Sequence, residues 1–168
     1  MAVLTLYIVV FIALSGLMAL VEAAVLSISP GEVEELVLRK KPGSLALQAV
    51  RHRLTRALVV IVLLTNTVNV LGPILAGSKA IELYGDAIIG LVTAILTFGT
   101  IVFSEIIPKS LGTHYAPVIS RAAAPVILAL IFALYPLVVA LAWITNLLKS
   151  GQRRIGTEEQ IRSLVSIG

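Results

Sequence analysis

Charged residues divide this chain into long apolar stretches. Four stretches contain no Asp, Glu, Lys or Arg: residues 1–21, 57–78, 87–104 and 122–148. The first apolar run continues past Glu22 to about Ser29, and the third continues towards Pro108. An α-helix needs about 20 apolar residues to cross the roughly 30 Å hydrocarbon core of a bilayer. The pattern therefore predicts an all-α membrane protein with up to four candidate spans.

The first apolar stretch has two interpretations, a cleaved signal peptide or a retained span. No basic segment precedes it, and its apolar run exceeds the roughly 7–15 residues of a signal peptide. A retained span is therefore favoured. Directly after it, Ser29-Pro30-Gly31-Glu32 has the form of a capping box with proline at the first helical position. This tetrapeptide predicts that a short helix begins there.

Basic residues are concentrated in the connection between the first two spans. Six of the chain's 13 Lys and Arg residues fall within 31–56. Pro42-Gly43-Ser44 predicts a break between two short helices, about 31–41 and 45–56, the second of which continues into the next span. Positive charge accumulates on the cytoplasmic side of membrane proteins, so this connection is predicted to be cytoplasmic and the N-terminus outside. The same rule explains the basic residues without a nucleic-acid partner.

The side on which the C-terminus lies depends on whether residues 122–148 cross the membrane. The external connection before the third span, about 77–86, holds Lys79 as its one basic residue. Without a fourth crossing, 12 Lys and Arg residues lie inside and 1 outside, whereas with it the numbers are 8 and 5. Pro125 and Pro136 also interrupt the stretch. We therefore favour a kinked, interfacial helix and a cytoplasmic C-terminus, with a fourth crossing as the alternative.

The composition narrows the functional classes. Apolar residues make up 58% of the chain and charged residues 13%, about half the share of charge in ordinary globular domains. The absence of Cys excludes a disulfide framework, a zinc finger and a thiol catalyst. The sequence shows no nucleophile–base pair, phosphate-binding loop or metal-ligating His motif, so the chain is predicted not to be an enzyme.

Polar side chains within the spans are few, and each costs free energy in hydrocarbon unless it has a partner or a function. Asn66 and Asn69 are three residues apart on the second span, so both amides are predicted to point into one interior site. Pro73 lacks the N–H that would pair with the carbonyl of Asn69 in an α-helix. The alternative is that the two amides only join neighbouring helices.

The third span repeats this arrangement. Pro108 leaves the carbonyl of Ser104 without its helical donor, directly beside Glu105. Unpaired carbonyls at membrane depth are tolerated where a neighbouring helix, water or a bound ion satisfies them. Oxygen ligands of this kind suit Mg²⁺, Ca²⁺ or Na⁺. A cation site is therefore predicted, and the alternative for Glu105 is an ion pair with Lys109.

Three motifs at these positions resemble the transmembrane module of the CNNM/CorB/CorC magnesium transporter family. They are Leu14-Ser15-Gly16-Leu17 with Glu22-Ala23-Ala24, Asn66-Thr67-Val68-Asn69, and Phe103-Ser104-Glu105-Ile106-Ile107-Pro108-Lys109. The last motif is the most specific, since it is similar to the family's Phe-Gly-Glu-Ile-x-Pro-Lys/Gln pattern. The chain departs from the family at Ser104, where glycine is common, and at Ala19, where a second serine often occurs.

The resemblance implies a fold of three transmembrane helices, a kinked juxtamembrane belt helix and two short cytoplasmic helices, which dimerises with a second copy in the cell membrane. It also implies an inward-opening Mg²⁺ site built from serine, asparagine, glutamate and main-chain oxygens. On this sequence the implied ligands are first Ser15, Asn69 and Glu105, and then Asn66, Ser104 and Gly112.

The predicted organisation has two parts. Residues 1–148 form a transmembrane ion-transport domain, and 149–168 form a cytoplasmic linker towards a CBS-pair module, with a capping box at Thr157-Glu158-Glu159-Gln160. The predicted function is magnesium transport out of the cell. The alternatives are a non-transporting anchor and dimerisation domain for a cytoplasmic regulatory module, and a sodium-binding or sodium-coupled transporter.

Overall fold

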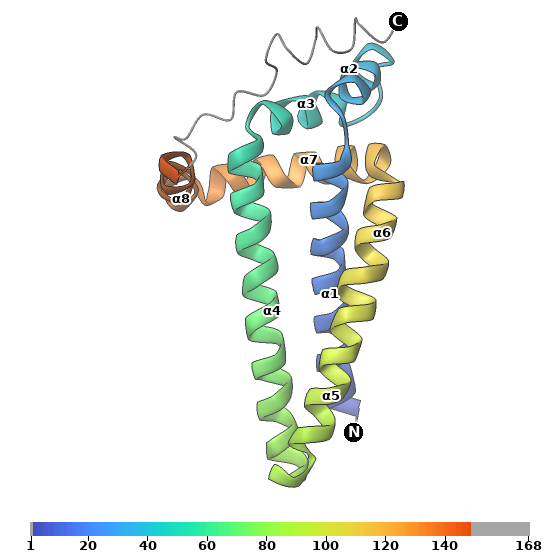
Figure 1. The fold of residues 1–168 in the computed structure, drawn as a ribbon, viewed down its shortest axis with the longest axis vertical. Helices are drawn as coiled ribbons and strands as arrows, with labels where there is room; N and C mark the ends of the chain where they lie inside the picture. The colour runs from blue at the N-terminus through green and yellow to red at the C-terminus, as the bar shows by residue number, and fades with distance from the viewer. Residues whose placement is uncertain (1, 149–168) are drawn as a thin grey trace, which may run out of the picture.

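The described part of the chain is built from helices joined by short turns, as predicted (Figure 1). The computed structural model describes residues 2–148 of the 168-residue chain. The predictions for the linker 149–168 lie outside the described residues. The helices are α1 (Ala2–Ser27), α2 (Pro30–Leu38), α3 (Ser44–His52), α4 (Leu54–Tyr84), α5 (Ile89–Gly99), α6 (Ile107–His114), α7 (Ala116–Ala133) and α8 (Tyr135–Leu148), with a 3₁₀ turn η1 (Asp86–Ile88) and a π-helical segment η2 (Thr100–Ile106).

Three long helical rods stand side by side in Figure 1: α1, α4, and the run from η1 through α5 and η2 to α6. α1 packs against α4 on one flank and against η2 and α6 on the other. α4 and α5 pack together near the turn that joins them. The rods contain apolar helices of 25, 31 and 29 residues, each long enough to cross a bilayer.

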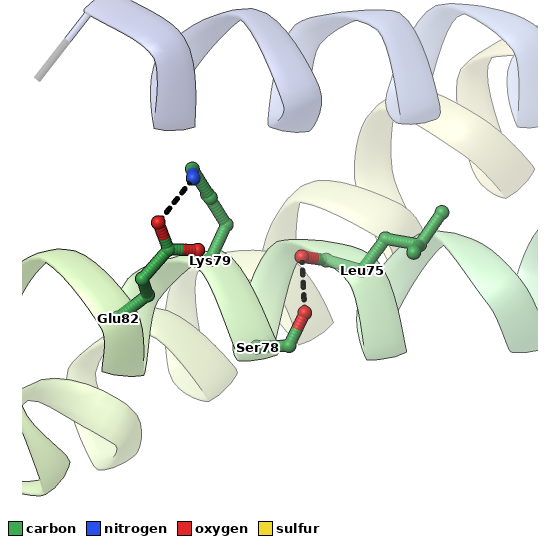
Figure 2. A network of polar contacts seen from close by, with 4 residues as sticks. All are labelled: Leu75, Ser78, Lys79 and Glu82. Carbon is green, nitrogen blue, oxygen red and sulfur yellow. Dashed lines mark hydrogen bonds and ion pairs between the residues drawn. The ribbon is translucent and has the colours of Figure 1, made fainter.

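The connection between α4 and the third rod is shorter than predicted. α4 continues through residues 77–84, which the sequence assigned to an external loop, and ends only at Gly85, whose φ of +76° leaves the helical region. Figure 2 shows how this last part of α4 satisfies its polar groups: Lys79 Nζ lies 2.6 Å from Glu82 Oε1, and the Ser78 hydroxyl donates to the Leu75 carbonyl at 3.0 Å. Because these groups pair within the helix, the helix does not need to end before them.

The capping box at the start of α2 is confirmed. The Ser29 N–H donates to Glu32 Oε2 at 2.8 Å, and the Glu32 N–H donates to Ser29 Oγ at 3.3 Å. The hydrogen bond from the Ser29 backbone, followed by that from its hydroxyl, holds the pKa of Glu32 below its ordinary value. Gly43, with φ of +79°, directly precedes α3 and lies at the predicted break.

The prediction that the second short helix runs into the next span is wrong. α3 ends at His52, and Arg53 leaves the helical region with φ of −115° and ψ of 32°. Its N–H pairs with the Val50 carbonyl three residues back, which tightens the last turn and separates α3 from α4. α4 can therefore take a direction different from that of α3.

The fourth apolar stretch forms α7 and α8, with a break at Leu134. Figure 1 shows α7 lying crosswise to α1, α4 and α6, at the ends of these helices that are remote from the turn between α4 and α5. Pro125 lies inside α7 without ending it. By length and composition alone, α7 is a fourth helix able to span a membrane, but its direction differs from that of the three rods.

Two apolar clusters hold the rods together, one near each end. The first joins the end of α1 to α3, the start of α4 and α7. The second joins the opposite ends of the rods through Leu4, Phe11, Ala76, Ala80, Val92 and Leu96. The predicted ligand Ser15 lies along α1 between these clusters. The fold therefore places a polar layer between two apolar layers.

Candidate cation site

The centre of the polar layer is a hydrogen bond between α1 and α4. The Ser15 hydroxyl donates to Asn69 Oδ1 at 2.6 Å, and Ser15 is only 1% exposed. α4 remains helical through Pro73, so the proline supplies no N–H to the Asn69 carbonyl. Two predicted ligands thus meet, although they lie on different helices and 54 residues apart in the sequence. An oxygen-bearing pair of this kind in hydrocarbon is either a helix contact or part of an ion site.

Thr65 was not among the predicted ligands, although its position shows why it belongs to this layer. It lies four residues before Asn69, and therefore on the same face of α4 one turn away. Among the buried side-chain oxygen and nitrogen atoms of the described residues, the Thr65 Oγ1 is the one without a hydrogen-bond partner. The spacing of Thr65 and Asn69 was the signal that sequence reasoning passed over.

The environment of α1 accounts for the unpaired Thr65 hydroxyl. α1 and α4 are antiparallel, so four residues forward on α1 corresponds to four residues back on α4. From the Ser15–Asn69 pair this step leads to Ala19 and Thr65. Ala19 is buried and carries no hydroxyl. A hydroxyl-bearing side chain at position 19 would stand at the level of Thr65.

The π-helical segment η2 gives the third rod a different local structure from that predicted. The Ile107 N–H pairs with the Val102 carbonyl, five residues back, rather than with a carbonyl four residues back. In this register Pro108 withholds its N–H from Phe103, not from Ser104 as an α-helix would require. The Phe103 carbonyl faces Gly16 closely, since a Cβ at Gly16 would lie 3.0 Å from the oxygen. The prediction of a freed Ser104 carbonyl is therefore corrected to Phe103.

Ser104 and Glu105 occupy opposite environments on η2. Ser104 is fully buried, and its hydroxyl donates to the Ile12 carbonyl of α1 at 3.1 Å, one turn from Ser15. Glu105 is exposed on the isolated chain. The ion pairs among the described residues are Glu35–Arg39 and Lys79–Glu82, so the predicted alternative of a Glu105–Lys109 pair is not found there. Among the described residues, no cationic side chain pairs with the Glu105 carboxylate.

Two other predicted ligands lie apart from the Ser15–Asn69 pair. Asn66 is exposed, and its Nδ2 donates to the Val62 carbonyl of its own helix at 2.9 Å, so the expectation that both amides enter one site is corrected. Gly112 packs against α1 further along, where an added Cβ would lie 2.3 Å from the Leu20 carbonyl oxygen. Close approach of two backbones explains the glycine at 112.

The assembled layer is rich in neutral oxygen and poor in charge. Its members are Ser15, Thr65, Asn69 and Ser104, with the Glu105 carboxylate adjoining Ser104 in sequence. Among residues 2–148 there is no group of three or more His, Cys, Asp or Glu side chains placed to hold a metal. Such a layer suits a hard cation that keeps part of its hydration shell, as Mg²⁺ usually does, and does not suit zinc or copper.

These features define a multi-pass α-helical membrane protein with a buried polar contact between two of its long helices. Residues 6–168 match the family model described as the cyclin M transmembrane N-terminal domain, CNNM. The chain therefore belongs to the CNNM transmembrane-domain family, the membrane module of the CNNM/CorC magnesium transporters. Membership in a transporter family also confirms the prediction that the chain is not an enzyme.

Curated relatives agree with this assignment. A UPF0053 protein of Synechocystis is 39% identical over 155 residues, which cover 92% of this chain and 45% of the relative. A UPF0053 protein of Haemophilus influenzae is 27% identical over 175 residues, covering 96% and 41%. The UPF0053 inner membrane protein YfjD of Escherichia coli is 31% identical over 93 residues, covering 55% and 22%. The chain thus spans less than half the length of these relatives.

Proposed function

We propose that this chain is the membrane part of a Mg²⁺ transporter and that the ion binds in the polar layer between α1, α4 and η2. The observation that carries the proposal is the Ser15–Asn69 contact, with the buried Ser104 and the unpartnered Thr65 hydroxyl beside it, in a chain of the CNNM family. An inward-opening site would take up Mg²⁺ from the cytoplasm, so the proposed direction is export.

In the proposed arrangement, the three rods cross the membrane and α7 and α8 form a belt at the cytoplasmic surface. The crosswise direction of α7 supports this placement, as does the concentration of Lys and Arg in 31–56. The N-terminus is then outside, and α2 and α3 are cytoplasmic. The layers hold the polar site at membrane depth, between the apolar clusters near each end of the rods.

The residues of the layer would have different roles in binding. Ser15 and Asn69 supply neutral oxygens, and Thr65 supplies a hydroxyl that needs a partner. Glu105 supplies the negative charge, which neutral ligands cannot replace for a divalent ion. A π-helical segment is locally less regular than an α-helix and is frequent at functional sites, which supports the proposed site beside η2.

The test is Mg²⁺ binding to Glu105→Gln, measured by calorimetry on the purified protein. The amide keeps the shape of the side chain but loses the charge, so we expect affinity to fall at least about tenfold, or 1.4 kcal/mol. Glu34→Gln removes an exposed carboxylate from α2 and is the matched control, with unchanged binding. Full affinity in Glu105→Gln contradicts the assignment of Glu105. Thr65→Val, which preserves shape, tests the hydroxyl in the same titration.

The two alternative functions predict different results in the same preparation. A Na⁺ site is indicated if NaCl stabilises the protein against heat as well as MgCl₂ of equal ionic strength. A non-transporting anchor is indicated if Asn69→Ala weakens the dimer and neither wild type nor variant binds Mg²⁺. We expect MgCl₂ alone to stabilise the wild type, because ligand binding to the folded state raises its stability.

A further inference from the structure

A charged cavity lies at the junction of α3, α4 and α8, apart from the polar layer. It has a volume of about 620 Å³ and is lined by Arg51, His52, Arg53, Thr55, Arg56 and Trp143, among others. α3 ends and α4 begins within this set, and α8 supplies the aromatic wall. The break at Arg53 is what brings the three arginines to one place.

Among the described residues, no carboxylate forms an ion pair with the arginines of this cavity. None of the acidic residues within 2–148 lines the cavity, and the ion pairs in that range involve only Arg39 and Lys79 as cations. The Arg56 guanidinium lies 5.9 Å from the centroid of the Tyr135 ring, a cation–π contact that orients it without neutralising it. Three like charges around one cavity repel each other, and a bound anion would remove that repulsion.

The chemistry of the cavity selects for phosphate with an attached apolar group. Guanidinium groups bind phosphate oxygens in pairs through parallel N–H donors. Trp143 and Val139 give the opposite wall an apolar surface, and Trp143 is 66% exposed. Tryptophan side chains favour the headgroup level of membranes. A free phosphate would use only the charged wall, whereas a phospholipid would use both.

We propose that this cavity binds the phosphate headgroup of an anionic phospholipid from the cytoplasmic leaflet. The proposal rests on the membrane placement given under the proposed function, in which α8 lies at the cytoplasmic surface, but not on Mg²⁺ binding. Basic cavities beside membrane helices on this side are suited to anionic lipid headgroups. Bound lipid would join α8 to the start of α4 and fix the belt against the rods.

The test uses Trp143, the single tryptophan of the chain, as its reporter. The 168-residue chain is placed in phosphatidylcholine nanodiscs with EDTA, and its fluorescence is recorded with brominated phosphatidylglycerol or brominated phosphatidylcholine at equal mole fraction. We expect brominated phosphatidylglycerol to quench the Trp143 fluorescence at least about twofold more strongly than brominated phosphatidylcholine, because basic residues at the surface enrich anionic lipid. Equal quenching by the two lipids overturns the proposal.

Matched variants separate the cavity from general surface charge. R51Q/R53Q/R56Q removes three charges that line the cavity, and R39Q/K40Q/K41Q removes three charges from the end of α2 outside it. We expect the first variant to lose the preference for phosphatidylglycerol and the second to keep it. An equal loss in both overturns the proposal. If the triple variant does not fold, Arg53→Gln alone, at an exposed position, must reduce the preference.

Two further outcomes distinguish the source of the phosphate and the membrane placement. Inorganic phosphate at millimolar concentration should leave the preference for phosphatidylglycerol unchanged. If phosphate abolishes this preference, the cavity binds a free anion and the proposal of a lipid headgroup is overturned. Quenching by neither lipid overturns both this proposal and the placement of α8. The Mg²⁺ titration of Glu105→Gln is independent of all these results, so the two proposals can fail separately.

Discussion

The two flanks of α1 show two ways of joining helices in a membrane. On the flank towards α4, side chains make the contacts: the Phe11 ring lies over Gly72, and the Ser15 hydroxyl bonds to Asn69. On the flank towards η2 and α6, backbones approach each other, with Gly16 against the Phe103 carbonyl and Gly112 against that of Leu20. Small residues permit such approach in membrane helices.

This difference separates an adjustable interface from a fixed one. A ring or hydroxyl can rotate to admit a ligand, but two backbones in contact cannot separate without moving a whole helix. The Ser15–Asn69 pair lies on the adjustable flank, whereas Ser104 and Glu105 belong to the segment joined by backbone contacts. Binding of a cation would therefore rearrange the α4 flank first.

The largest expected effect comes from adding a methyl group to the fixed flank. In Gly112→Ala the new Cβ meets the Leu20 carbonyl oxygen at 2.3 Å, and backbone cannot yield as a side chain does. We expect a loss of stability of about 3 kcal/mol, at the upper end for overpacking. Thermal unfolding in detergent measures it. Gly90→Ala, with no atom within 4 Å of its new Cβ, is the control and should be stabilised slightly.

A smaller effect is expected from changing the helical register of the fixed flank. Pro108→Ala restores an N–H, which favours an α-helical register in place of η2. Changing the hydrogen-bond spacing from five residues to four would turn Glu105 by about 100° around the helix axis relative to the residues after it. We therefore expect Mg²⁺ affinity to fall about tenfold. Calorimetry would show this fall. In contrast, Pro73→Ala in the already α-helical α4 should weaken binding only about twofold. Equal effects of the two variants would remove the distinction between the flanks.

The smallest effect is expected on the adjustable flank. The new Cβ of Gly72→Ala meets the ring of Phe11, a buried side chain of the second cluster, rather than backbone, so the ring must shift within that cluster. The cost of moving the ring is partly offset by the higher helix propensity of alanine, so we expect a net loss of about 1 kcal/mol or less. The same unfolding measurement compares it with Gly112→Ala. A larger loss for Gly72→Ala than for Gly112→Ala would reverse our assignment of the two interfaces.

The sequence predicted the long apolar helices well because charge spacing is a direct record of contact with hydrocarbon. The capping box at Ser29 and the break at Gly43 were also confirmed, since both depend on neighbouring residues alone. The extension of α4 to Tyr84 was missed because polar residues such as Lys79 and Glu82 resemble a loop until they pair along one helix.

The site was predicted in part, for a physical reason that its residues make clear. The family resemblance implied that Ser15 and Asn69 belong to one site, and their contact depends on two helices meeting, which the structure shows. The π-helical register of η2 cannot be derived from a single proline, because Pro108 is compatible with either register. The spacing of Thr65 and Asn69 places both on one face of α4, but only the structure shows that the Thr65 hydroxyl is buried and has no hydrogen-bond partner among the described residues.

The tight turn at Gly85 also bears on how the protein enters its membrane. In the proposed orientation, the hairpin of α4 and α5 carries few charges to the far side: Lys79 already neutralised by Glu82, and Asp86 in the turn. Short connections with little positive charge are readily translocated. The two helices are thus suited to insertion by the translocon as one preformed unit, with no hydrophilic loop left to thread across afterwards.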